Sequence, residues 1–147
     1  MPDRKTLKHI IIPEHNFDFP DHDMLMEIVK LQREFMERVK FPVHIQLKED
    51  KLAYTGTARF SGVNIVLQDL LACIHNETEE IRDWLPWKHW RKYEGFEIEL
   101  EEIRLEFIDL LHFLLDAMIY LGMSGEDIYR YYKCKMDENH RRQEHGY

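Results

Sequence analysis

Two pairs of acidic residues have a spacing that could support chemistry. Glu77 and Glu80 form an E-x-x-E pair, and Glu106 and Asp109 form an E-x-x-D pair. Residues three apart on a helix lie side by side, so each pair would present two carboxylates on one face. Oxygen ligands without histidine or thiolate favour Mg²⁺, for which Mn²⁺ can substitute, and Mg²⁺ often binds substrate phosphates as well. These four residues are therefore candidate metal ligands.

Both pairs fall on helices that the apolar pattern predicts. The second helix is expected from Ser61 or Asn64 to Leu85, and its buried face is marked by Leu67, Leu70, Ile74, Ile81 and Trp84. The run Glu97–Leu121 becomes apolar almost all round after Phe107, which is typical of the central helix of a bundle. One acidic pair alone is common on a solvated helix. Two pairs that both interrupt apolar stripes favour a metal site.

The first helix carries a polar residue on an apolar stripe. This helix is expected to begin near Asp21 or Asp23 and to end before Pro42. Its expected buried stripe consists of Leu25, Ile28, Phe35 and Val39, with Met24 and Leu31 alongside. Gln32 completes this stripe, either as an edge residue or as a group that faces a ligand.

Basic residues gather in two places after the acidic helix. Lys135, Asn139 and Arg142 lie on one face of the last helix, which Ser124-x-x-Asp127 would cap. Lys88 and Lys92 belong to an aromatic and basic cluster that follows the second helix. Such residues usually form a solvated surface. Beside a carboxylate metal site, they could instead bind phosphate groups.

Composition sets the remaining limits. The 147 residues suit a single domain, 1–147, with an all-α fold, an irregular N-terminal arm in 1–20 and a loop with a small hairpin in 43–60. The formal charge of −8 argues against nucleic acid as a partner. Two cysteines, and the absence of a signal peptide or a membrane-length apolar run, lead us to expect a cytoplasmic protein without a membrane partner.

These motifs resemble those of the all-α nucleoside triphosphate pyrophosphatases. Within that superfamily, the sequence is similar to the dimeric dUTPases and especially to the phage dCTP/dUTP pyrophosphatases. The resemblance rests on both acidic pairs, on the stretches 87–92 and 109–113, and on the C-terminal pattern Lys135-x-x-x-Asn139-x-x-Arg142-x-x-x-Gly146-Tyr147. It implies a four-helix-bundle core, a homodimer, and an enzyme that acts in the host cytosol if a phage encodes it.

The resemblance also implies a reaction and residue roles. The reaction is the Mg²⁺-dependent hydrolysis of dUTP, dCTP or both to the monophosphate and pyrophosphate. Glu77 would activate water as well as bind metal, and Gln32 would face the base. Phosphates would be held by Lys135, Asn139, Arg142 and Tyr147, with Lys88 and Lys92 as further candidates.

The sequence departs from the dimeric dUTPase pattern at one point. Those enzymes follow the glutamine of the first helix with a polar amide about one turn later, where this chain has Phe35 and Met36. We therefore expect this chain to discriminate less strongly between dUTP and dCTP than a strict dUTPase does. Two other classes stay open: a di-iron carboxylate bundle, which Asp109-x-x-His112 and Asp137-x-x-His140 imitate, and a non-enzymatic acidic interaction protein.

Overall fold

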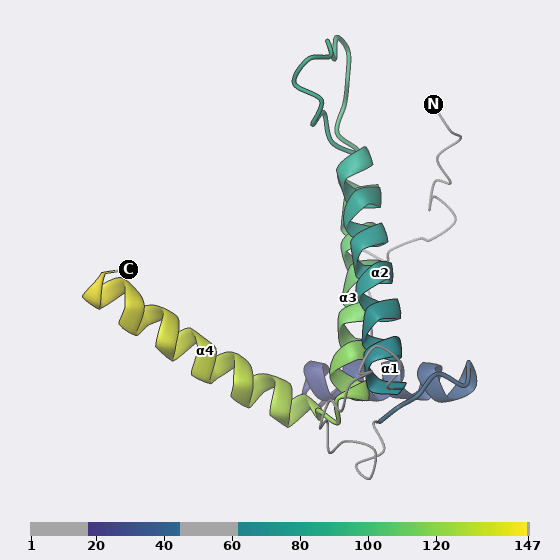
Figure 1. Cartoon of the computed structure of the whole chain (residues 1–147), viewed down its shortest axis with the longest axis vertical. Helices are drawn as coiled ribbons and strands as arrows, with labels where there is room; N and C mark the ends of the chain where they lie inside the picture. Colours follow the sequence, from purple (N-terminus) through teal and green to yellow (C-terminus); the bar gives the residue numbers. More distant parts are fainter. Residues whose placement is uncertain (1–17, 45–61, 147) are drawn as a thin grey trace, which may run out of the picture. The chain divides into compact units, whose positions relative to one another are not determined.

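The computed structural model describes residues 18–44 and 62–146, and most of these residues are helical. They form four α-helices and no strand (Figure 1): α1 (Met24–Arg38), α2 (Gly62–Asp83), α3 (Leu100–Tyr120) and α4 (Gly125–His145). The all-α class is thus confirmed for this part of the chain. Residues 1–17 of the expected arm and residues 45–60 of the expected hairpin lie outside the described residues.

The helix ends follow local signals in the sequence. Asp23 caps α1, because its carboxylate accepts hydrogen bonds from the backbone N–H groups of Leu25 and Met26 at 2.9 and 3.2 Å. The expected capping box of Ser124 and Asp127 begins α4, with both reciprocal hydrogen bonds present. These caps satisfy N–H groups that a helix cannot pair internally.

The chain divides into two compact units, and each is described by itself. In the described residues, the first unit holds α2 and α3 as far as Leu114, while the second holds α1, α3 from Leu115 onwards, and α4. The single-domain organisation expected from the sequence stays a prediction.

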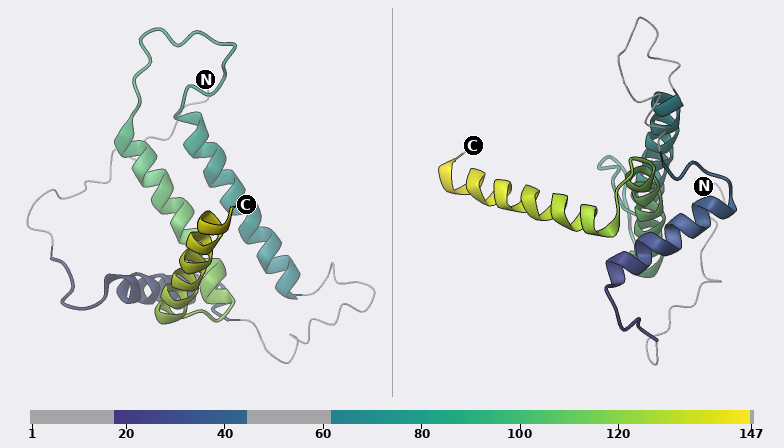
Figure 2. Two further views of the ribbon diagram at one scale, coloured as in Figure 1. Left: turned by 90° about the vertical axis from the view of Figure 1, so that its left-hand side faces the viewer. Right: turned by 90° about the horizontal axis from the view of Figure 1, so that it is seen from below.

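The first unit pairs α2 with α3. The two helices run side by side in opposite directions and are joined by residues 84–99 (Figures 1 and 2). The expected buried face of α2 is confirmed at Leu70, Ile81 and the following Trp84, although α2 ends at Asp83, two residues before the expected end. The antiparallel pairing brings the acidic segments of α2 and α3 to the same level.

The second unit buries a different face of α1 from the expected one. Its buried residues are Val29, Gln32 and Met36, which share one face at i, i+3 and i+7. The predicted stripe was wrong for most of its members, since Ile28, Leu31, Phe35 and Val39 are 42%, 54%, 57% and 53% exposed. Apolar residues occur on two sides of α1, and the side that contains Gln32 is the covered one.

A close contact between α1 and α4 forms part of this unit. A Cβ atom on Gly125, the first residue of α4, would lie 3.3 Å from the Cα of Met26. Glycine therefore allows the backbone of α4 to approach α1 at this point.

In the described residues, no single helix is long and apolar enough to cross a membrane, although α3 and α4 reach that length and composition together as a bent pair.

Candidate metal centre

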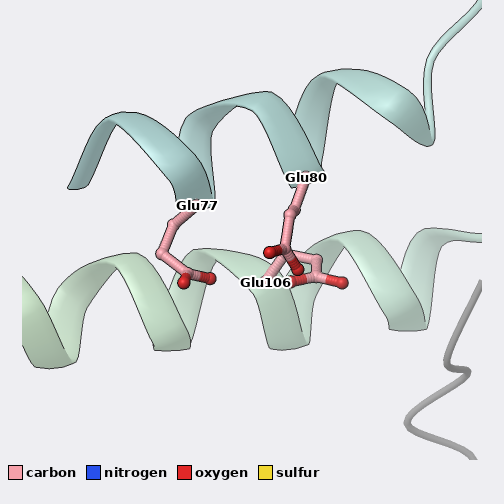
Figure 3. A group of neighbouring side chains, drawn as sticks. All are labelled: Glu77, Glu80 and Glu106. Carbon is pink, nitrogen blue, oxygen red and sulfur yellow. The ribbon is translucent and has the colours of Figure 1, made fainter. Parts of the chain in front are cut away.

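Three glutamates come together between α2 and α3 (Figure 3). Glu77 and Glu80 lie one turn apart on α2, and Glu106 projects from α3. One carboxylate oxygen from each residue lies within 4.8 Å of the other two. Glu106 is buried, Glu77 is half-buried and Glu80 is exposed, so the group is accessible from solvent on the side of Glu80.

The donor set fits a hard divalent cation. Each Mg²⁺–oxygen bond is about 2.1 Å, so two oxygens bound to one ion lie at most about 4.2 Å apart. The observed limit of 4.8 Å is slightly larger, so binding of one ion by all three residues would require small rotations of the glutamate side chains. Three carboxylates supply hard oxygen ligands and an excess of negative charge, which is the chemistry that Mg²⁺ and Mn²⁺ require.

Burial and neighbouring charges make the ionised forms of Glu77 and Glu106 less favourable than those of a free glutamate. Burial raises the pKa of Glu77 above 4.5, and the charges of Glu80, Asp109 and Glu106 raise it further. Burial also raises the pKa of Glu106, with added contributions from Glu80, Asp109 and Glu102. A divalent cation would relieve this repulsion.

Asp109, the fourth expected ligand, lies outside this group of three. Its carboxylate Oδ1 is 3.7 Å from Nδ1 of His112, one turn further along α3. Even so, its charge raises the pKa values of both Glu77 and Glu106, so it lies within electrostatic reach of the group. Asp109 stays a predicted ligand.

Neutral groups around the carboxylates were not expected from the sequence as part of the site. The indole Nε1 of Trp84 donates a hydrogen bond to Oε1 of Glu106 at 3.1 Å, and both side chains are buried. The side-chain amide of Asn76 donates to Oε1 of Glu80 at 2.6 Å. Glu102, one turn before Glu106, is buried as well, with an exposed fraction of 4%. Periodicity placed Trp84 on the buried face but gave no signal for its hydrogen-bond partner.

The predicted phosphate-binding residues lie in both units. In the first unit, Lys88 and Lys92 belong to the segment after α2, and Nζ of Lys88 lies 5.1 Å from the ring centroid of Trp87. In the second unit, three predicted residues are exposed on α4, namely Lys135, Asn139 and Arg142. Tyr147 lies outside the described residues. All six phosphate-binding roles stay predictions.

Arg142 already has a carboxylate partner on α4. Its Nε donates a hydrogen bond to Glu138 at 2.9 Å, and Arg141 contacts the same carboxylate. Hydrogen bonds from Arg141 and Arg142 lower the pKa of Glu138 to about 2. A phosphate group would therefore compete with Glu138 for the Arg142 guanidinium.

Gln32, the predicted base-binding residue, belongs to the second unit. Its side chain is only 8% exposed, and its amide Nε2 donates a hydrogen bond to Oδ1 of Asp116 on α3 at 2.7 Å. Of the two residues that replace the second amide of dimeric dUTPases, Met36 is buried and Phe35 is exposed. The covered face beside Gln32 is therefore apolar at the next turn.

Comparison with known protein families assigns the chain to one of them. The family model described as dUTPase matches residues 24–123, which is more than half of the sequence. The chain belongs to the dUTPase family. Its matched region includes α1, α2 and α3 and contains every predicted metal ligand. The sequence resemblance to dUTPases is thus confirmed.

Two phage proteins are similar to this dUTPase-family chain. A dCTP pyrophosphatase of Enterobacteria phage LZ5 is 38% identical over 80 residues, which cover 50% of this chain and 46% of that protein. A dCTP pyrophosphatase of Enterobacteria phage T4 is 35% identical over 71 residues, which cover 42% of each chain. The chain therefore spans less than half the length of these relatives. No solved structure gives a significant match.

The family assignment also bears on the di-iron alternative. The carboxylate group that the structure brings together contains three glutamates, whereas a di-iron bundle of the known type uses Glu-x-x-His pairs. Asp137, from the second imitating pair, forms an exposed ion pair with Lys133 at 3.2 Å. The geometry and the family therefore both favour nucleotide chemistry over di-iron chemistry.

Proposed function

We propose that this dUTPase-family chain hydrolyses a deoxypyrimidine triphosphate, dUTP, dCTP or both, to the monophosphate and pyrophosphate, and that it requires Mg²⁺ or Mn²⁺. The observation that carries the proposal is the meeting of three glutamate oxygens from α2 and α3 within 4.8 Å, in a family of nucleotide hydrolases. The two phage relatives are described as dCTP pyrophosphatases, which supports a pyrimidine substrate.

The carboxylates divide the work in this proposal. Glu80 and Glu106 would hold the cation together with Glu77. Asp109 would join them, since its charge already raises the pKa of Glu77. When bound, the cation would acidify water and offset the negative charge on the phosphates. Glu77 would accept a proton from the attacking water, a role that suits a carboxylate whose pKa burial has raised. The water oxygen would bond to one phosphorus of the α–β linkage while the bond from that phosphorus to the bridging oxygen breaks, so that the bridging oxygen leaves with the other product.

Basic residues would bind the phosphates, and Gln32 would bind the base. Lys88, Lys92, Lys135 and Arg142 supply positive charge, while Asn139 and Tyr147 supply hydrogen-bonding groups. We also propose a homodimer, as the family resemblance implies. Its support is an apolar stripe on α1 that one copy leaves exposed, formed by Met24, Ile28, Leu31, Phe35 and Val39. Sedimentation should then report two copies per particle.

Product analysis tests the reaction. Purified protein should convert dUTP or dCTP to the monophosphate and pyrophosphate with Mg²⁺, and the reaction should stop when EDTA is added. Glu77→Gln, purified in parallel, controls for a contaminating phosphatase, because the variant should remain folded and lose the activity. Release of orthophosphate with the nucleoside diphosphate would contradict the proposal, as would equal activity in the variant.

A further inference from the structure

The hydrogen bond between Gln32 and Asp116 fixes the orientation of a buried amide. Nε2 of Gln32 donates to Oδ1 of Asp116 at 2.7 Å, and Gln32 is more than nine-tenths buried. An ionised carboxylate only accepts hydrogen bonds, whereas an amide has a donor end and an acceptor end. The opposite orientation would lose the hydrogen bond and place Oε1 of Gln32 against a carboxylate oxygen. Asp116 therefore directs Oε1 away from itself.

The acceptor end of this amide is the feature from which we infer that a ligand binds here. Within residues 18–44 and 62–146, the bond to Asp116 is the only hydrogen bond of the Gln32 side chain, so Oε1 has no donor there. A buried acceptor without a donor is costly, and native proteins rarely leave one unsatisfied. A bound molecule that presents an N–H group would supply the missing hydrogen bond.

Pyrimidine bases carry such an N–H group on the edge that proteins can read. Cytosine has the exocyclic amino group at position 4, and uracil has the ring N3–H. We propose that Asp116 is a positioning residue, which orients the Gln32 amide so that Oε1 accepts an N–H hydrogen bond from the pyrimidine of the substrate. This inference rests on the proposed function and adds a residue that makes no direct contact with the base.

The orientation also bears on the choice between the two bases. An amide that rotated freely could offer either a donor or an acceptor at one place. The amide held by Asp116 offers its acceptor, which suits the amino group of cytosine and the N3–H of uracil alike. Asp116 therefore selects for a base with an N–H donor and leaves the choice between cytosine and uracil to other contacts.

A substrate that lacks the N–H group tests this directly. The deoxynucleoside triphosphate of pyrimidin-2-one has neither the amino group nor the N3–H. Wild type should hydrolyse dCTP or dUTP with a kcat/KM roughly 10- to 100-fold above that of this analogue, because the analogue leaves Oε1 unpaired. In Gln32→Leu and Asp116→Ala the ratio should fall close to one. Asp116→Asn, whose amide can pair with Gln32 in either orientation, should give an intermediate ratio.

The controls separate positioning from folding. If Asp116 only stabilised the fold, its substitution would lower kcat/KM for all three nucleotides equally, and an unchanged ratio would overturn the inference. Asp116→Asn keeps the shape of the side chain and serves if the alanine variant does not fold. Asp69→Asn makes the same change at an exposed position on α2 and should leave the ratio unaltered. A wild-type protein that hydrolyses neither dCTP nor dUTP would instead refute the proposed function itself.

Discussion

Replacing Trp84 by phenylalanine removes one hydrogen-bond donor from the candidate metal centre and keeps an aromatic ring in its place. In the native chain, the indole N–H donates to Glu106 at 3.1 Å, and the two side chains are 7% and 5% exposed. A hydrogen bond to a charged group contributes about 1.5–3 kcal/mol. The bond also lowers the pKa of Glu106 against the effect of burial, so its loss makes the ionised carboxylate less favourable.

The expected result is a weaker metal site. Loss of a group that orients a metal ligand commonly reduces affinity about 10- to 100-fold, which agrees with the energy of this hydrogen bond. Isothermal titration of Mn²⁺ into Trp84→Phe should therefore give a Kd higher by that factor, at a pH where the carboxylates are ionised. The smaller ring also leaves a cavity, so the melting temperature should fall, and the titration must be made well below it.

A second tryptophan supplies the matched control. Trp90 is 68% exposed, and in the described residues its indole N–H donates no hydrogen bond. Trp90→Phe makes the same chemical change and should leave Mn²⁺ affinity as in wild type. Unchanged or tighter binding in Trp84→Phe would refute the reasoning, since it would mean that the indole neither orients Glu106 nor keeps it ionised.

Three further predictions concern the charged side chains of the candidate site and of α4. Glu77→Gln should abolish turnover while Glu79→Gln, on an exposed residue that pairs with an arginine at 3.3 Å, should be nearly neutral; equal losses in steady-state assays would show that the assignment of the helix face is wrong. Arg142→Ala should raise KM for the nucleotide at little cost in melting temperature, because the side chain is exposed; wild-type kinetics would show that it binds no phosphate. Burial raises the folded-state pKa values of Glu77 and Glu106 above 4.5, so the folded chain holds these protons more tightly than the unfolded chain does. The resulting contribution to the free energy of unfolding is complete below about pH 4.5 and is lost as the pH rises through the raised pKa values. Urea unfolding of the metal-free protein should show a smaller loss over this range in Glu106→Gln, and an equal loss would contradict the predicted shift.

Local sequence signals were sufficient for the helices and for the acidic pair on α2. Asp23 and the Ser124–Asp127 box act through hydrogen bonds to residues two or three positions away, so their effect can be recognised in the sequence. The spacing of Glu77 and Glu80 is equally local, because three residues make almost one turn. The apolar stripe of α2 then placed this pair on the side that faces α3.

Contacts between distant parts of the chain could not be predicted in this way. The partner of Gln32 is 84 residues away in sequence, and that of Trp84 is 22 residues away. Periodicity shows that a side chain faces a neighbour, but the register between two helices decides which atom it meets. The same limit explains why the predicted buried face of α1 was wrong. Apolar residues lie on two sides of this helix, and tertiary packing buries the side with Val29 and Met36.

The immediate partners of the carboxylates explain why this group suits a cation. Glu79, on the exposed side of α2, pairs with an arginine one turn further along the helix. Its neighbour Glu80 receives a neutral amide N–H from Asn76, and Glu106 receives a neutral indole N–H from Trp84. A guanidinium would cancel the charge of a carboxylate, whereas a neutral donor orients the group and leaves that charge in place. The negative charges of the cluster therefore repel one another. Burial is the main cause of the raised pKa values of Glu77 and Glu106, this repulsion raises them further, and a divalent cation would remove it.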